Sequence, residues 1–166
     1  MSGVESYLPV GTAEFPFEGV FDGQGYAIKN IAFKTDVTSQ LTAGIFGALK
    51  GTVRNLTVGA DGDVWTITGT CTAGTAVAGV AATTVEGAVI ENCTNNVSFD
   101  FQAEDAKDVL ASIAGIAADA SGLTVTKCTN NADIHVKDLA NTGNGGKGLQ
   151  LAGIVGYAKA SSVISE

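Results

Sequence analysis

Short runs in which apolar and polar residues alternate recur along the chain. Their apolar positions are occupied mainly by Val, Ile and Phe, one of them holds the single Trp, and Gly or Asn stands at the breaks between them. Examples are residues 64–68, 97–101 and 133–136. A two-residue period of β-branched and aromatic residues is typical of strands that bury one face. The pattern therefore predicts many short β-strands.

The chain also repeats itself at a nearly constant interval. Ala-Gly-Ile or Ala-Gly-Val blocks recur after 35, 36 and 38 residues, beginning at Ala43, Ala78, Ala114 and Ala152. A second series interleaves with them, beginning at Ile28, Val53, Ile90, Val125 and Val163. The longest match joins residues 91–96 to residues 126–131. Periods of this length occur in helical and in β solenoids, and the strand-like segments favour the β form.

Together these patterns predict an all-β fold. We expect a right-handed, single-stranded parallel β-helix of about four coils, with roughly three short strands in each coil. Residues 1–166 would form one domain, with repeat blocks starting near residues 17, 43, 78, 114 and 152. The repeats vary in length at residues 34–41, 70–76, 102–110 and 137–149, which are expected to be lateral loops.

The Ile-x-Asn units predict where the chain bends. In a straight strand Ile28 and Ile31 would point to opposite faces, which would expose a large apolar side chain. A corner at Asn30 turns both inward, because Asn tolerates the left-handed backbone conformation. The corner residues would stack as a ladder of amide hydrogen bonds along the axis. The expected ladder consists of Asn30, Asn55 and Asn92, and Lys127 at the fourth corner should interrupt it.

Cys93 and Cys128 fall at equivalent inward positions of successive coils. Ile31 and Leu56 occupy the same position in the other coils, so both cysteines are expected to be small buried apolar residues. A disulfide is the alternative, because parallel strands lie about 4.8 Å apart. Cys71 belongs to a segment that varies between repeats, so the sequence predicts no role for it.

The charge of the chain excludes some classes of partner. The net charge is −8, and the single Arg and eight Lys are scattered. No basic stripe can neutralise phosphates, so we expect neither nucleic acid nor an anionic membrane as a partner. No apolar run is long enough for a membrane span, and residues 1–5 lack the features of a signal peptide. The chain is expected to be soluble, or exported with its leader removed.

Residues 16–31, with the block Phe21-Asp22-Gly23-Gln24-Gly25, resemble the opening of GLUG-type repeat proteins. Residues 43–49 and 53–56 continue this resemblance, whereas residues 78–84 and 114–120 lack its second Gly and its aromatic residue. GLUG-type proteins are adhesin-like β-helical surface proteins of gut Bacteroidetes with a pectate-lyase-like superhelix. The resemblance implies a bacterial protein located outside the cell or on its surface. It also implies that this chain is a fragment of a longer exported protein.

Three functions fit the sequence. The first is a non-catalytic extracellular module for adhesion or glycan contact, whose partner is a glycan or a host or cell-surface protein. The second is a polysaccharide lyase or hydrolase, which needs carboxylates from neighbouring coils to converge in a groove. The third is a passive stalk. Arg54 and His135 are expected to be ordinary outward surface residues, so the sequence favours the non-catalytic module, with no cofactor.

The candidate ligand-binding residues are Trp65, Asp61, Asp63 and Tyr157. Trp65 would stack on a neutral sugar while the two acids orient its hydroxyls, directly or through Ca²⁺. The alternatives are that Trp65 fills the core and that the acids only shape a polar turn. Asp22 is expected to cap a tight turn.

The two ends of the chain predict a further contact. Aromatic residues crowd the first coils, and they would form an aromatic core or end cap, or alternatively a platform for sugars. A β-helix that stops inside a repeat exposes unpaired strand edges and apolar interior. We therefore expect end-to-end self-association through residues 1–15 and 153–166.

Overall fold

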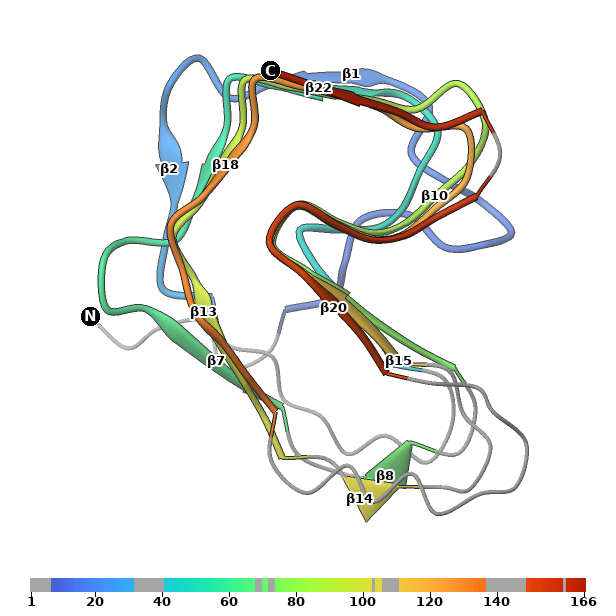
Figure 1. Ribbon diagram of the computed structural model, residues 1–166. Helices are drawn as coiled ribbons and strands as arrows, with labels where there is room; N and C mark the ends of the chain where they lie inside the picture. The colour runs from blue at the N-terminus through green and yellow to red at the C-terminus, as the bar shows by residue number, and fades with distance from the viewer. Residues whose placement is uncertain are drawn as a thin grey trace.

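The fold is a right-handed parallel β-solenoid whose strands stack turn upon turn (Figure 1). The computed structural model describes residues 7–31, 41–67, 70–71, 74–102, 104–105, 111–136, 149–159 and 161–166. Every strand pairing within these ranges is parallel, and each strand lies beside its counterpart one turn away. The all-β prediction is confirmed, since the described residues contain no helix.

Three of the sheets form one half of the cross-section. The first contains β1 (Val20–Asp22), β5 (Thr52–Arg54), β11 (Val89–Glu91), β17 (Thr124–Thr126) and β22 (Val163–Ser165). The second contains β2 (Ala27–Ile28), β6 (Thr57–Val58), β12 (Thr94–Asn95) and β18 (Thr129–Asn130). The third contains β7 (Val64–Ile67), β13 (Ser98–Phe101) and β19 (Ile134–Val136).

The remaining sheets complete each turn. One contains β8 (Thr70–Cys71) and β14 (Glu104–Asp105). The next contains β3 (Leu41–Ala43), β9 (Thr75–Ala78), β15 (Ala111–Ala114) and β20 (Leu149–Ala152). The last contains β4 (Phe46–Leu49), β10 (Ala81–Thr84), β16 (Ala117–Ala120) and β21 (Val155–Ala158).

The solenoid has about three turns, which corrects the expected four. They run from β3 to β8, from β9 to β14 and from β15 to β19, with partial turns before and after. Within the described residues the first repeat block supplies only part of a turn. It contributes two strands, β1 and β2, which pair with β5 and β6 of the next turn. The strands also outnumber the expected three in each turn, because corners divide each predicted strand region into shorter pieces. In the predicted lateral loops the structure has β8, β14 and the start of β9, and most other residues of these loops lie outside the described ones.

Rows of inward side chains fill the solenoid. Phe21, Val53, Ile90, Val125 and Ile164 occupy one register position on five successive strands. The three central members, Val53, Ile90 and Val125, are buried. Burial of one such side chain stabilises the fold by roughly 1.5–3 kcal/mol. Stacking of like on like therefore forms a continuous apolar core.

The two sheets that contain the Ala-Gly blocks bend back toward the middle of the cross-section (Figure 1). Between them lies a separate cluster of small buried residues, Ala76, Ala78, Ala82 and Ala118. The Ser112 hydroxyl donates a hydrogen bond to the carbonyl oxygen of Ala118 at 2.7 Å, which ties the sheets together. The repeated alanines thus allow the two sheets to approach closely.

Aromatic side chains cover the core near the start of the chain. The rings of Phe17 and Phe21 lie 5.1 and 5.6 Å from the ring of Phe46. The Tyr7 hydroxyl donates a hydrogen bond to the carbonyl oxygen of Ile45 at 2.8 Å. These contacts confirm the end-cap interpretation for Phe17 and Phe21, whereas Phe15 is exposed.

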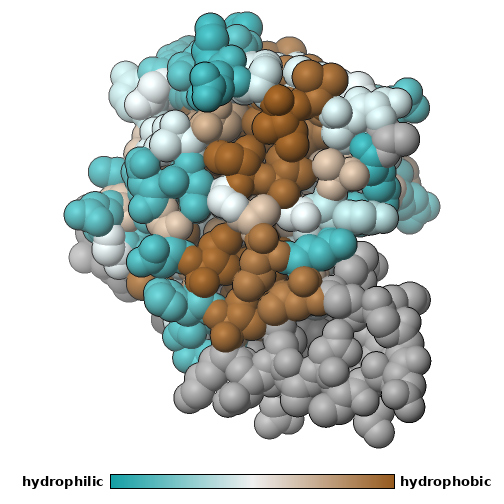
Figure 2. Space-filling model, viewed as in Figure 1, coloured by the Kyte–Doolittle hydropathy of each residue, from teal (hydrophilic) through white to brown (hydrophobic). Residues whose placement is uncertain are grey.

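The opposite end of the solenoid exposes apolar side chains. Ile164 belongs to an inward row, yet 53% of its surface is exposed. Figure 2 shows apolar residues gathered across the end of the solenoid that faces the viewer. Leu151 and Val163 add to this exposed apolar surface. The described residues contain no long apolar helix of the kind that crosses a membrane.

We expect the chain to associate end to end through this surface, because association removes apolar side chains and strand edges from water. The sedimentation coefficient should rise with protein concentration. Ile164→Lys should abolish the rise, because it places a charge on the end. Thr124→Lys, on the outer side of β17 in the same sheet, is the matched control. A wild-type sedimentation coefficient that does not change with concentration would contradict this expectation.

Candidate functional site

Trp65 lies in the core, so the proposal that it stacks on a sugar is wrong. Only 2% of its surface is exposed, and its ring lies 5.6 Å from that of Phe99 on the next turn. Along β7, Val64 and Thr66 point outward while Trp65 and Ile67 point inward. The alternation of the strand therefore places the largest apolar side chain inside.

Asp61 and Asp63, in the turn that precedes β7, have different surroundings. The Asp63 carboxylate accepts a hydrogen bond from the backbone N–H of Ala60 at 2.8 Å, and so stabilises its own turn. Asp61 is exposed in the same turn, next to Gly62. Within the described residues, no group of three or more His, Cys, Asp or Glu side chains is arranged to hold a metal ion. The polar-turn interpretation is confirmed for Asp63.

Tyr157 is accessible, with 37% of its surface exposed. The Lys159 ammonium lies 5.6 Å from the centre of its ring and 2.8 Å from an Asp119 carboxylate oxygen. Tyr157 lies on β21, in a different sheet from the β6–β7 turn that carries Asp61 (Figure 1). The structure therefore does not bring the predicted ligand residues together into one site.

The corner ladder exists, with one change of member. Asn55 and Asn92 adopt the predicted left-handed conformation, with φ of 54° and 49°. The Asn92 amide donates to the Asn55 amide oxygen at 2.8 Å, and Asn55 donates to the Asp22 carboxylate at 3.0 Å. Asn30 is also left-handed, but it follows β2, and β2 pairs with β6. Asn30 therefore lies at a different corner, and its assignment to this ladder is wrong.

Asp22 ends the ladder and takes part in two further interactions. The Asn55 amide, the backbone N–H of Gln24 and the Arg54 guanidinium all donate to it, which holds the pKa of its carboxyl below the usual value. Its bond from Gln24 confirms the predicted turn cap. Arg54 is held in an ion pair with Asp22 at 2.9 Å on the surface. At the other end of the ladder, Lys127 adopts the same left-handed corner, with φ of 51°.

A second, buried ladder was not predicted. Asn95 is fully buried, and its amide donates to Asn130 on the next turn at 2.8 Å and to the carbonyl of Val97 at 3.0 Å. Its own oxygen accepts the backbone N–H of Val97 at 3.2 Å. A buried amide without partners would cost about 1–3 kcal/mol, so these bonds make its burial tolerable. The repeated Cys-Thr-Asn-Asn segment was the available signal.

The buried ladder also explains the second residue of the Ala-Gly blocks. A Cβ added at Gly79 would collide with the side-chain oxygen of Asn95, and a Cβ at Gly115 would collide with Asn130. The two repeats found separately in the sequence therefore interlock in space. Glycine is required where the bent sheets approach the asparagine side chains.

His135 has a neighbour that the sequence did not reveal. It is exposed, as predicted, and it pairs in register with Asp100 on the previous turn. The Gln102 amide donates to Asp100 at 2.6 Å. An acid and an imidazole thus occupy adjacent positions on one outer face, which gives the catalytic alternative its one specific observation.

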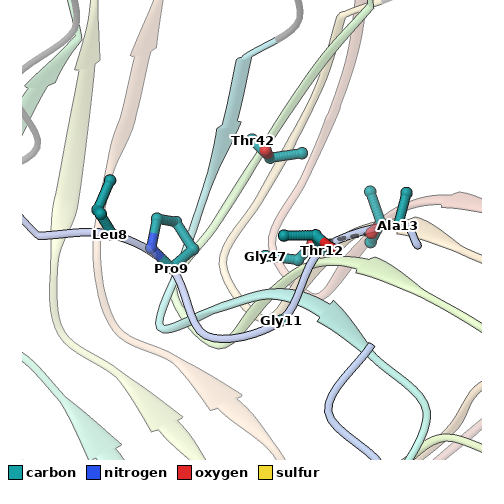
Figure 3. A pocket seen from close by; sticks show the side chains of 8 residues that line it. Leu8, Pro9, Gly11, Thr12, Ala13, Thr42 and Gly47 are labelled. Atoms are coloured by element: carbon teal, nitrogen blue, oxygen red, sulfur yellow. Dashed lines mark hydrogen bonds between the residues drawn. The ribbon is translucent and has the colours of Figure 1, made fainter. Parts of the chain in front are cut away.

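The structure also contains a hollow that no sequence pattern indicated. It has a volume of about 390 Å³ and lies between the 8–13 segment and strands β3, β4 and β10 (Figure 3). Backbone hydrogen bonds between Val10 and both Ile45 and Gly47 hold the segment against β4. The lining residues are Leu8, Pro9, Gly11, Thr12, Ala13, Thr42, Gly47 and Thr83.

Comparison with models of protein families, with curated proteins and with solved structures found no match. The resemblance to GLUG-type repeats remains a prediction from the sequence.

We expect Trp65→Ala to lower the free energy of unfolding by about 3–5 kcal/mol, because it leaves a large cavity in the core. Val64→Ala, on the outer side of the same strand, should change it by less than about 0.5 kcal/mol. Denaturant unfolding followed by circular dichroism measures both values. An unchanged midpoint for Trp65→Ala would contradict burial of the indole.

Extending the corner ladder should stabilise the protein. Lys127→Asn retains a residue that tolerates the left-handed corner and adds an amide that can donate to Asn92. We expect the free energy of unfolding to rise by about 0.5–1.5 kcal/mol. Lys127→Ala is the control, and the gain should vanish in an Asn92→Ala background. Equal effects of Lys127→Asn and Lys127→Ala would show that the amide does not join the ladder.

Proposed function

We propose that this chain is a non-catalytic extracellular module that contacts neutral glycans. The observation that carries the proposal is the lining of the hollow beside the 8–13 segment. None of its lining side chains is ionisable, and three of them carry hydroxyls. This composition suits a ligand that is uncharged and rich in hydroxyls. The volume of the hollow lies within the range of small-molecule sites.

Thr83 and Thr12 each keep a hydrogen-bonding group that a ligand could use. Thr83 donates its hydroxyl hydrogen to the carbonyl of Gly47 at 2.8 Å, which leaves its oxygen lone pairs as acceptors. Thr12 accepts the backbone N–H of Phe15 at 3.1 Å and retains its own hydrogen as a donor. Leu8 and Pro9 add apolar surface against which the C–H face of a sugar ring would pack.

The surface charges support a binding role over a catalytic one. Asp22 is paired with Arg54, Glu18 with Lys50 and Asp119 with Lys159. Each of these three carboxylates is therefore neutralised by a neighbouring cationic side chain. The neighbouring acid and imidazole that a hydrolase could use, Asp100 and His135, lie on β13 and β19, on the opposite side of the cross-section from β10 (Figure 1).

The test is binding to an array of neutral and acidic oligosaccharides. We expect binding to neutral saccharides, and Thr42→Val should weaken it about tenfold, because one hydrogen bond is worth about 1 kcal/mol or slightly more. Thr66→Val, on the exposed outer side of β7, is the matched control and should leave binding unchanged. Both variants should unfold at the wild-type temperature.

Three results would overturn this proposal. No binding to any saccharide would favour a stalk. Binding that is unchanged in Thr42→Val would show that the saccharide binds outside the hollow. Release of new sugar ends from an oligosaccharide, lost in His135→Ala, would establish the catalytic alternative.

A further inference from the structure

Two thiols lie one above the other inside the solenoid. Cys93 and Cys128 directly precede β12 and β18, whose residues pair in register. The backbone N–H of Thr129 donates to the carbonyl of Cys93 at 2.9 Å, so the two cysteines occupy the same position of successive turns. Parallel strands place such positions about 4.8 Å apart, which is within the Cα separation that a disulfide spans. Both thiols are free in the structure.

The two thiols differ in their access to solvent. Cys93 is fully buried beneath the last turns. Cys128 is partly buried and lines a cavity of about 210 Å³ at the exposed apolar end, together with Ile164 and Glu166. A small reagent that enters this cavity would therefore meet Cys128 first. Cys93 would be reached only through Cys128.

We propose that Cys93 and Cys128 are a reactive pair that exchanges with low-molecular-weight disulfides and closes into a disulfide between two successive turns. The outer thiol acts as the attacking group and the buried thiol as the resolving group. The disulfide would join turns at the point where Ile90 and Val125 of the core stack.

The protonation of the pair favours this order. The hydrogen bond between the two side chains lowers the pKa of the Cys128 thiol. The same hydrogen bond, together with burial, raises the pKa of the Cys93 thiol. The thiolate is the nucleophile in disulfide exchange, so the more accessible sulfur is also the one that ionises first.

The chemistry is a two-electron oxidation of the protein by the small disulfide. The Cys128 thiolate attacks one sulfur of RSSR, forms a mixed disulfide with it and releases RS⁻. Cys93 then loses its proton and attacks the Cys128 sulfur, which breaks the mixed disulfide and releases the second RS⁻. Two molecules of RSH leave with the two thiol protons, and the cysteines are joined.

Each thiol also contacts a backbone carbonyl oxygen of its own turn. The Cys93 sulfur lies 3.3 Å from the carbonyl oxygen of Glu91, and the Cys128 sulfur lies 3.3 Å from that of Thr126. These are weak hydrogen bonds of the thiols, so their loss on oxidation costs little. In the reduced protein the two thiols pack as small side chains inside the solenoid. In the oxidised protein the disulfide would restrict the unfolded chain.

The probe is 2-hydroxyethyl disulfide, which is neutral and small, added to the folded full chain in a Cys71→Ser background. We expect both remaining thiols to disappear without a lasting adduct. Peptide mapping should then find Cys93 joined to Cys128, and the oxidised protein should unfold several degrees higher because the cross-link restricts the unfolded chain.

Single substitutions test the assigned order. Cys93→Ser should trap a mixed disulfide on Cys128, whereas Cys128→Ser should leave Cys93 reduced under the same conditions. The proposal is overturned if both thiols of the two-cysteine protein stay reduced, or if an adduct on Cys128 persists without closure. Faster reaction of Cys93 than of Cys128 in the single variants would also overturn it.

Discussion

Each residue of the described turns lies beside its own counterpart one turn away, and this parallel register is the constraint on which the structure depends. It makes an inward position a property of a whole row, because an inward side chain packs against the inward side chains of the turns above and below. An apolar row such as Val53, Ile90 and Val125 then becomes a continuous core. A buried polar side chain is stabilised by hydrogen-bond partners, and Asn130 supplies one for Asn95 from the next turn.

The register also connects features that are distant in the sequence. The glycine of an Ala-Gly block and the buried asparagine that follows it belong to opposite sides of the same turn, and they meet because the bent sheets bring them together. The paired thiols and the His135–Asp100 neighbours arise in the same way, from equivalent positions on adjacent turns. Chemistry on this fold can therefore be built from rows, because the members of a row on adjacent turns lie close together.

Much of the fold could be predicted from the sequence, because a period-two pattern and a repeat each have a direct structural meaning. The left-handed corners at Asn55 and Asn92 followed from the need to turn two large apolar residues inward. The place of Asn30 did not follow, because residues 28–31 resemble the corner segments at 53–56 and 90–93, and only strand pairing shows that Asn30 lies at another corner. Asp22 replaces it in the ladder, since a carboxylate accepts the same hydrogen bond as an amide oxygen.

The candidate site was less predictable than the fold. Trp65 obeyed the alternation of its strand, and the sugar-stacking hypothesis was wrong because it set that alternation aside. The hollow beside the 8–13 segment depends on hydrogen bonds from that segment to Ile45 and Gly47, and no periodic signal encodes them.

The most direct test of the register is a set of nuclear Overhauser contacts between labelled methyl groups. The account predicts contacts from Val53 to Ile90 and from Ile90 to Val125. Contacts from Val53 to Val89 instead would contradict it, because they would show that the strands pair one residue out of step.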